Sequence, residues 1–272
     1  MSDHSSSADF VAITERQKDT WATGDFNQIA RQNVAMAEPL CEAVELRAGQ
    51  RVLDLACGSG TAALVAARRY CEVTGIDFVP ALIERARARA DAEGLEATFM
   101  VGDAQDLPFP DASFDAVISV YGVHFAPDQE RSAAEMLRVC RPGGKIGLAS
   151  PVPEGWSGDF FKTNATYMPP PPGVRPPLRW GTEEGIEELL GQGISNATSE
   201  KRTALQYFRS VDHAVEVFLT YFGPAIRASR SERGDKLKDD LKTVFNRYNR
   251  ATDGTAVIEN TYMLTVAVCN GA

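Results

Sequence analysis

The chain has 272 residues, of which 44% are hydrophobic and 24% are charged, and its formal net charge is −9. This length suits a core domain with an appended cap, and the acidic balance argues against nucleic-acid partners, whose phosphates need a basic surface. No apolar run reaches the roughly 18 residues of a membrane span. The polar start at residues 1–7 lacks the regions of a signal peptide, and we interpret it as a disordered tail. We therefore expect a cytoplasmic protein with no membrane span.

The cysteines and the densest cationic run point to neither a metal nor a nucleic acid. Five cysteines form an odd set without metal-ligand spacing, so we expect reduced thiols packed as small apolar side chains, and no metal. Arg85, Arg87 and Arg89 alternate with alanines along a predicted helix. We interpret these arginines as a solvated face.

Residues 8–46 show a helical pattern, which predicts two or three helices ahead of the first strand. Trp21 and Phe26 lie in this segment. Either these aromatic side chains anchor the helices to the core, or they line a ligand pocket, and the sequence leaves both interpretations open.

The stretch Arg51–Thr61, RVLDLACGSGT, is the most informative part of the chain. Its apolar start suits a strand that is covered on both faces. Gly58 and Gly60 let the backbone turn tightly before a helix at residues 61–69, and the N-terminus of that helix would point at a ligand. We interpret the stretch as a nucleoside-binding turn.

Asp54 distinguishes between two classes of cofactor for this turn. The spacing of Gly58, Gly60 and Ala63 fits the dinucleotide fingerprint loosely. A carboxylate just ahead of the glycines would repel a pyrophosphate, but it would attract the ammonium and sulfonium charges of S-adenosylmethionine. The run resembles the first motif of class I S-adenosylmethionine-dependent methyltransferases, and this resemblance implies S-adenosylmethionine as the cofactor.

Two further predicted strands end at a carboxylate. Asp77 ends the second strand, where it can accept both ribose hydroxyls of a nucleoside or cap the helix that begins at Pro80. Asp103 follows the third strand at residues 97–102. It is either the acceptor of an adenine amino group, as the resemblance implies, or a turn residue. The resemblance implies cofactor contacts from Asp54, Ala56, Gly58, Gly60, Asp77, Phe78, Asp103, Ala104 and Ser119.

The exit of the predicted fourth strand, residues 113–120, faces the reacting methyl group in the resembled family. It lacks both the Asn/Asp-Pro-Pro-aromatic run of nucleobase methylation and the acidic pair of a magnesium-bound catechol site. Nucleic-acid and metal-dependent reactions are therefore disfavoured. His124 lies in this exit as a candidate general base for a hydroxyl or amine acceptor, with a hydrogen-bonded structural role as the alternative.

Residues 137–144, LRVCRPGG, closely resemble the segment before strand five in methyltransferases of the ubiquinone/menaquinone type. We interpret residues 141–144 as a turn and residues 145–149 as that strand. The resemblance runs from about Arg51 to Ser150. It implies an α/β fold with a doubly wound, mostly parallel seven-stranded sheet of the Rossmann-like methyltransferase class, in which strand seven is antiparallel.

The remainder of the chain is expected to cover the site. Residues 151–181 hold more than half of the 15 prolines and five aromatic residues, which predicts an irregular lid over an apolar pocket. A strand at residues 197–208 follows, and then come two amphipathic helices separated by Gly223-Pro224. A last strand at residues 257–269 closes the sheet.

These patterns predict four segments and one function. The segments are N-terminal helices over the cofactor (1–46), a cofactor-binding core (47–150), a substrate cap with strand six (151–255) and the last strand (256–272). The predicted function is C- or O-methylation of a small, largely apolar acceptor by a monomer or homodimer. The alternatives are a nicotinamide-dependent oxidoreductase, which would need the Tyr-x-x-x-Lys that we do not find, and a cofactor-binding protein without turnover.

Overall fold

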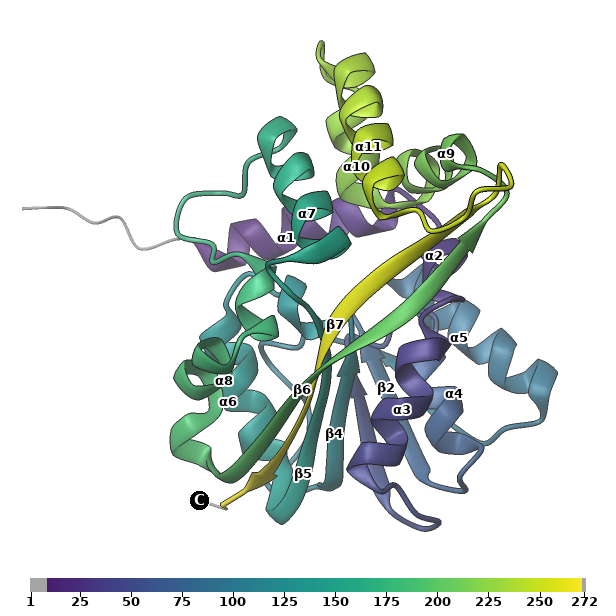
Figure 1. The fold of residues 1–272 in the computed structure, drawn as a ribbon. Helices are drawn as coiled ribbons and strands as arrows, with labels where there is room; N and C mark the ends of the chain where they lie inside the picture. Colours follow the sequence, from purple (N-terminus) through teal and green to yellow (C-terminus); the bar gives the residue numbers. More distant parts are fainter. Residues whose placement is uncertain (1–8, 271–272) are drawn as a thin grey trace, which may run out of the picture.

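A seven-stranded sheet forms the centre of the molecule (Figure 1). The computed structural model describes residues 9–270, so the predicted disordered tail at residues 1–7 lies outside the described residues. The strands are β1 Arg51–Leu55, β2 Glu72–Asp77, β3 Thr98–Val101, β4 Phe114–Val120, β5 Cys140–Pro151, β6 Ile194–Phe208 and β7 Ala256–Cys269. Their order is β3-β2-β1-β4-β5-β7-β6, and β7 is antiparallel to both of its neighbours. The mostly parallel, doubly wound sheet is confirmed.

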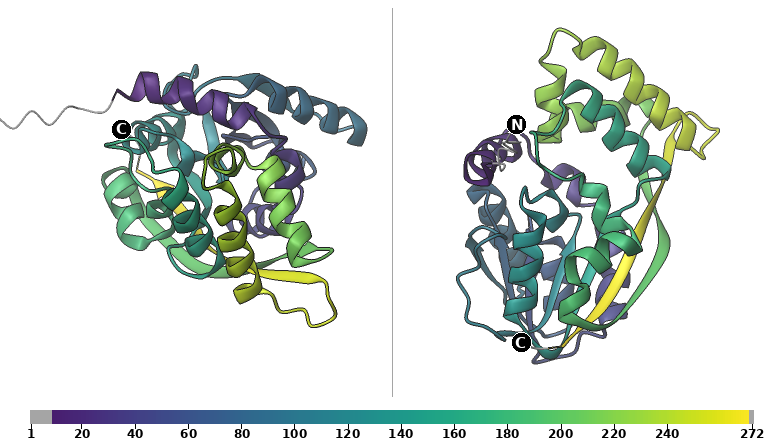
Figure 2. Two further views of the ribbon diagram at one scale, coloured as in Figure 1. Left: turned by 90° about the horizontal axis from the view of Figure 1, so that it is seen from above. Right: turned by 90° about the vertical axis from the view of Figure 1, so that its left-hand side faces the viewer.

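Helices cover both faces of this sheet (Figures 1 and 2). The helices are α1 Phe10–Ala22, α2 Asn27–Ala30, α3 Val34–Val44, α4 Thr61–Ala67, α5 Pro80–Glu93, α6 Gln129–Val139, α7 Gly155–Tyr167, α8 Glu183–Leu190, α9 Val211–Tyr221, α10 Gly223–Ser229 and α11 Gly234–Tyr248, with short 3-10 helices η1 Val123–Phe125, η2 Pro177–Gly181 and η3 Gly191–Gly193. One face carries α3, α4 and α5, and the other carries α6 and α8.

β1 shows why its sequence is a nearly continuous apolar run. Val52 belongs to the apolar cluster beneath α3 and α4, whereas Leu53 and Leu55 belong to the cluster beneath α6 and α8. All three side chains are completely buried. A central parallel strand is covered on both faces, so the side chains that point to either face need to be apolar. The polar exception is Asp54, which is also buried.

The last two strands extend beyond the rest of the sheet (Figure 1). β5 pairs with β7 only as far as Pro151 opposite Tyr262, but β6 and β7 continue to Phe208 opposite Ala256. We use the name cap for α7, α9, α10 and α11, which lie around this extension above the strands' carboxyl ends. The cap has its own apolar core, which includes Phe245.

The predicted irregular lid is mostly helical, and this part of the prediction is wrong. Residues 155–167 form α7, and residues 177–181 form η2. Between them, three of the four prolines at residues 169–172 are exposed. None of these four prolines lines the cavity at the carboxyl ends of the strands or the cavity beneath the cap. The aromatic residues of α7 therefore pack inside the cap, whereas the prolines lie on its surface.

Two smaller predictions also need correction. The Gly223-Pro224 pair does more than separate two helices: it opens a third helix, α10, because proline is favoured in a first helical turn. Residues 141–144 do not form the predicted turn before strand five. They lie within β5, where the pairing with β4 shifts between Phe114 and Ala116.

The prediction that these arginines form a solvated face is wrong for Arg89, which contacts the glycine turn. The Arg89 guanidinium donates to the Ser59 carbonyl oxygen at 2.6 Å, to Ser59 Oγ at 3.1 Å and to Thr61 Oγ1 at 3.2 Å. This side chain crosses from α5 to the start of α4. It therefore holds the glycine turn in place.

Three further predictions concern membrane-spanning helices, disulfide bonds and metal sites. The described residues contain no helix with the length and apolarity that a membrane crossing requires. All five cysteines are buried and free of disulfide bonds. Within residues 9–270, we find no cluster of three or more His, Cys, Asp or Glu side chains arranged to hold a metal ion.

Candidate active site

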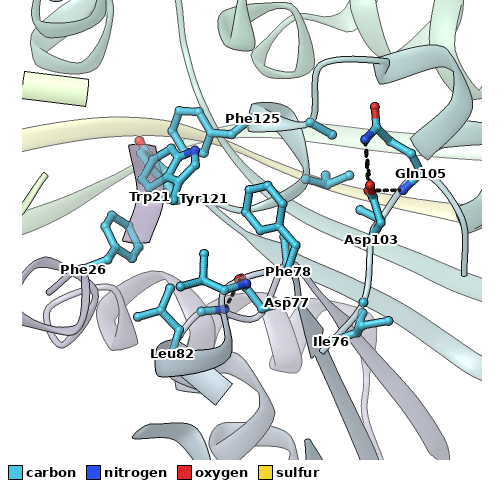
Figure 3. A pocket seen from close by; sticks show the side chains of 18 of the residues that line it. Trp21, Phe26, Ile76, Asp77, Phe78, Leu82, Asp103, Gln105, Tyr121 and Phe125 are labelled. Carbon is cyan, nitrogen blue, oxygen red and sulfur yellow. Dashed lines mark hydrogen bonds between the residues drawn. The ribbon is translucent and has the colours of Figure 1, made fainter. Parts of the chain in front are cut away.

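A cavity of about 620 Å³, partly open to solvent, lies at the carboxyl ends of β1, β2, β3 and β4 (Figure 3). Six predicted site residues line it: Ala56, Gly58, Asp77, Phe78, Asp103 and Ala104. These six residues follow or end β1, β2 and β3, whose carboxyl ends the topology brings together around one space, as expected for an open parallel sheet.

The glycine turn uses its two glycines differently. Gly58 and Gly60 both adopt left-handed backbone angles, with φ of 54° and 79°. Gly58 lines the cavity, whereas a Cβ on Gly60 would lie 3.0 Å from the Phe99 ring. Gly60 is therefore needed for internal packing, and Gly58 is the glycine that lets the backbone approach a ligand.

Asp77 joins the turn to the end of β2. Its Oδ2 accepts a hydrogen bond from the Gly58 amide at 2.9 Å, and its Oδ1 accepts one from the Val79 amide at 2.9 Å. Burial raises the pKa of this carboxyl to about 6, against the lowering effect of the two amides. Each carboxylate oxygen has a second lone pair, so Asp77 can still accept hydrogen bonds from a ligand's hydroxyls.

Asp54 lies behind the cavity rather than on its wall. Its Oδ2 accepts a hydrogen bond from the Ala63 amide at 2.7 Å, which ties β1 to the first turn of α4. Asp54 is not among the described residues that line the cavity. Its charge can act on a ligand through space, but a direct contact would require movement of the turn.

Asp54 should make the protein less stable at high pH. Burial raises its pKa to about 7, and the neighbouring Asp77 charge adds to this rise while the Ala63 amide opposes it. The unfolded chain loses this proton near pH 4, so the stability that the proton confers is lost as the pH rises through about 7.

We expect Asp54→Asn to remove this pH dependence. Between about pH 5.5 and about pH 8.5, the unfolding free energy of the parent should fall by about 2 kcal/mol more than that of the variant. Urea titrations of both proteins across this range measure the difference. Parallel pH profiles would contradict the raised pKa.

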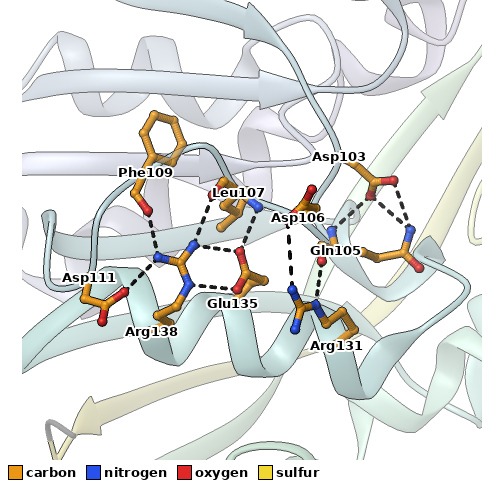
Figure 4. A network of polar contacts seen from close by, with 9 residues as sticks. All are labelled: Asp103, Gln105, Asp106, Leu107, Phe109, Asp111, Arg131, Glu135 and Arg138. Carbon is orange, nitrogen blue, oxygen red and sulfur yellow. Dashed lines mark hydrogen bonds and ion pairs between the residues drawn. The ribbon is translucent and has the colours of Figure 1, made fainter.

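Asp103 lies on a loop that α6 holds in place (Figure 4). One Asp103 carboxylate oxygen accepts hydrogen bonds from the Gln105 backbone amide at 2.9 Å and from its side-chain amide at 3.0 Å. The Arg131 guanidinium donates to the Gln105 carbonyl oxygen at 3.0 Å. Asp103 is thus a turn residue, and it also lines the cavity, so the two interpretations of this residue are compatible.

A partly buried ion pair fixes the rest of this loop (Figure 4). The Arg138 guanidinium bonds Glu135 Oε2 at 2.7 Å and donates to the Leu107 and Phe109 carbonyl oxygens at 3.0 and 2.7 Å. The Leu107 amide donates to Glu135 Oε2 at 2.7 Å. The hydrogen bond from Arg138 is the main cause that lowers the pKa of Glu135. The conspicuous Arg138 of the LRVCRPGG segment therefore supports the loop and does not contact the cavity.

Ser119 and His124 do not reach the cavity wall in the described part of the chain. Ser119 Oγ donates to the Leu55 carbonyl oxygen at 2.7 Å and accepts from the Val123 amide at 2.9 Å, which links β1 to η1. The His124 ring is buried between aromatic neighbours, and burial lowers its pKa to about 3. A general base at this position would need a different ring orientation, because the ring does not line the cavity. Its Nε2 has no partner among residues 9–270.

Aromatic side chains close the upper side of the cavity (Figure 3). Trp21 and Phe26 come from the N-terminal segment, and Tyr121 and Phe125 follow β4. The Trp21 ring lies 5.4 Å from Phe26 and 4.7 Å from Phe125, measured between centroids. Trp21 and Phe26 therefore line the pocket and also anchor the N-terminal helices. Sequence reasoning missed Phe125, whose only signal was its place in the exit of β4.

A second, smaller cavity lies beside the first, beneath the cap. Phe26, Tyr121 and Phe125 line both cavities. The rest of the second wall is mostly aromatic and comes from α7, α9 and the extended ends of β6 and β7: Trp156, Phe160, Phe161, Gln206, Phe218, Phe222 and Asn260, with Ile29 and Asn33. Tyr121, which has an unusual φ of 49°, thus separates two adjoining spaces.

Comparisons with known proteins agree with this arrangement. The family model described as a methyltransferase domain matches residues 52–144. An uncharacterised protein from Mycobacterium tuberculosis is 39% identical over 223 residues, which is 81% of each chain. Demethylmenaquinone methyltransferase from Thermus thermophilus is 42% identical over 120 residues, or 43% of this chain and 54% of the relative.

A solved structure shows the same fold. The YcgJ protein of Bacillus subtilis superposes with a TM-score of 0.60 over 87% of this chain and 99% of its own, at 21% identity. The shared sheet, the family match and the sequence relatives lead to one conclusion. This chain belongs to the class I S-adenosylmethionine-dependent methyltransferases, and its methyl donor is S-adenosylmethionine.

Proposed function

We propose that this enzyme methylates a small, largely apolar metabolite that binds in the second cavity. The observation that supports this most strongly is the shared wall of Phe26, Tyr121 and Phe125, which sets an apolar space directly beside the proposed cofactor cavity. The chain's acidic balance and the enclosed aromatic wall both fit such an acceptor better than a nucleic acid.

The residues of the first cavity fit S-adenosylmethionine. We propose that Asp77 accepts the ribose hydroxyls, and that Asp103 and the Ala104 amide meet the adenine, between Phe78 and the loop after β3. Gly58 and Ala56 would face the methionine part. Asp54 and Asp77 would place two carboxyl groups near its positive charges. The support is that all of these residues except Asp54 line one cavity.

When bound, the cofactor supplies an activated methyl group on a positively charged sulfur. The chain's own residues then have to orient the acceptor and exclude water, which alone can lower a barrier by several kcal/mol. Trp21, Phe26 and Phe125 are placed to exclude water at the boundary of the two cavities. No step of this proposal requires His124.

Two neighbouring interpretations receive less support. The methyltransferase matches do not favour the nicotinamide-dependent oxidoreductase, and the buried Asp54 carboxylate ahead of the glycine turn would oppose a pyrophosphate. The Thermus thermophilus relative is named for demethylmenaquinone, but it matches only 43% of this chain. We therefore propose the class of acceptor and not that particular compound.

We expect S-adenosylmethionine and S-adenosylhomocysteine to bind in the micromolar range, and NADH not to bind. Isothermal titration calorimetry measures all three. The enzyme should also release S-adenosylhomocysteine when it is supplied with apolar aromatic or prenylated acceptors. Efficient methylation of a tRNA or a folded protein, with no activity on such compounds, would overturn the proposed acceptor class.

A further inference from the structure

The second cavity contains a polar group of side chains on its otherwise aromatic wall. Asn260 is fully buried, and its Oδ1 accepts hydrogen bonds from Ser157 Oγ at 2.6 Å and from the Tyr121 hydroxyl at 3.1 Å. The Tyr121 hydroxyl also lies 3.0 Å from Ser157 Oγ. These three residues come from β7, α7 and the loop after β4, so the packing of the cap assembles them.

Three atoms of this wall have unused hydrogen-bonding capacity. Asn260 Nδ2, Gln206 Oε1 and Trp156 Nε1 are buried and have no partner in the described part of the chain. Asn260 and Gln206 both line the cavity with amide side chains, and Gln206 is only 4% exposed. An unpartnered buried polar atom is costly, so such atoms call for a partner that the chain does not supply.

The sheet places these two amides near each other. Asn260 pairs with Ala204, and Gln206 pairs with Ile258, so Asn260 and Gln206 are diagonal neighbours on β7 and β6. Diagonal neighbours lie about 7–8 Å apart and their side chains leave the same face of the sheet. A single oxygen atom between two such side chains can bond to both.

We propose that Asn260 and Gln206 bind a hydroxyl group of the acceptor, an inference that rests on the proposed function of the cavity. A hydroxyl can accept from Asn260 Nδ2 and donate to Gln206 Oε1 at once, whereas an ether or a ketone can use only the first. No charged side chain of residues 9–270 lines this cavity, so an ionised group would lose its hydration without a counter-charge. The acceptor class is thus a hydroxylated apolar compound.

The site would also fix how the acceptor lies relative to the cofactor cavity. Tyr121 bonds Asn260 through its hydroxyl, and it lines both cavities. A compound anchored at Asn260 is therefore held beside the boundary between the two spaces. Asn260 and Gln206 are positioning residues in this proposal, since no bond is made or broken at either side chain.

The test compares two probes of nearly equal shape, 4-ethylphenol and ethylbenzene. Both are titrated into 15N-labelled enzyme saturated with S-adenosylhomocysteine, and chemical-shift changes give the dissociation constants. We expect 4-ethylphenol to bind at least about tenfold more tightly, because two hydrogen bonds distinguish the probes. In Asn260→Leu and in Gln206→Met this preference should fall to about threefold or less, with ethylbenzene affinity retained.

Asn164→Ala is the matched control, because Asn164 is another buried cap asparagine but does not line the cavity. This variant should keep the parental preference. Equal affinity of the parent for both probes would overturn the hydroxyl site and leave the proposed function standing. If one of the two variants fails to fold, the other is a sufficient test, because a retained preference for 4-ethylphenol in that variant overturns the proposal.

A different experimental result would contradict the proposed function. A parent enzyme that prefers 4-ethylphenol but releases no S-adenosylhomocysteine with any apolar acceptor would support the hydroxyl site and contradict the methylation proposal. Failure of both probes to bind would overturn the acceptor cavity and the hydroxyl site together.

Discussion

Replacing Phe245 with alanine should lower the free energy of unfolding by about 3–5 kcal/mol. Phe245 is fully buried in the cap, with ring centroids 5.5 Å from Trp156 and 5.5 Å from Phe218. The substitution removes a large apolar side chain and leaves a space that the surrounding rings fill only in part. Urea unfolding followed by tryptophan fluorescence measures the loss, because Trp156 lies in the affected cluster.

Tyr207→Ala provides the control for this prediction. Tyr207 is an aromatic residue on β6, but its side chain is 61% exposed. Its removal should change the unfolding free energy by less than about 1 kcal/mol. Equal losses from Phe245→Ala and Tyr207→Ala would mean that the aromatic core of the cap does not stabilise the folded chain as its burial indicates.

Replacing Asp77 with alanine should weaken the binding of S-adenosylhomocysteine by about 1.5–3 kcal/mol, or about 10- to 150-fold. The proposed charged acceptor for two ribose hydroxyls is lost. The Gly58 and Val79 amides also lose the carboxylate that holds them at 2.9 Å, so the turn becomes less fixed. Calorimetry at neutral pH measures the affinity, and thermal unfolding shows whether the variant still folds.

Asp115→Ala is the matched control for Asp77→Ala. Asp115 also accepts a backbone hydrogen bond, from the Arg51 amide at 2.7 Å, but it lies at the amino end of β4, beside the start of β1, and does not line the cavity. The control should bind S-adenosylhomocysteine with parental affinity. If Asp77→Ala also keeps that affinity and only melts at a lower temperature, Asp77 is a structural cap and not a ribose ligand.

The sequence predicted the sheet well because its local signals were unambiguous. β2 ends at Asp77 and α5 begins at Pro80, as predicted, since proline can occupy a first helical turn; Gly94 takes the left-handed angle that ends this helix. The ends of successive parallel strands must lie at one edge of the sheet. Residues such as Asp77 and Asp103 could therefore be placed together without any knowledge of their contacts.

The same reasoning failed where a side chain's direction depended on distant packing. Asp54, Ser119 and His124 all lie near a strand end, as predicted, yet their side chains point into the protein and bond or pack there. Arg89 had the spacing of a solvated residue, but its long side chain reaches the turn before α4. Spacing along the chain indicates a position, but it does not decide which neighbours a side chain meets.

The order of the strands and the glycine turn could be predicted from short stretches with strong backbone preferences, and the class of cofactor followed from the Asp54 charge and the family resemblance of the turn. The second cavity could not be predicted in this way. Its wall combines residues from the N-terminal helices, the loop after β4, α7, α9 and the extended β6–β7 pair, which are far apart in the chain. Gln206 and Asn260 lie in stretches where apolar and polar residues alternate, which predicts strands but not which strands pair. Their side chains lie on one face of the sheet because of the pairing register of β6 and β7.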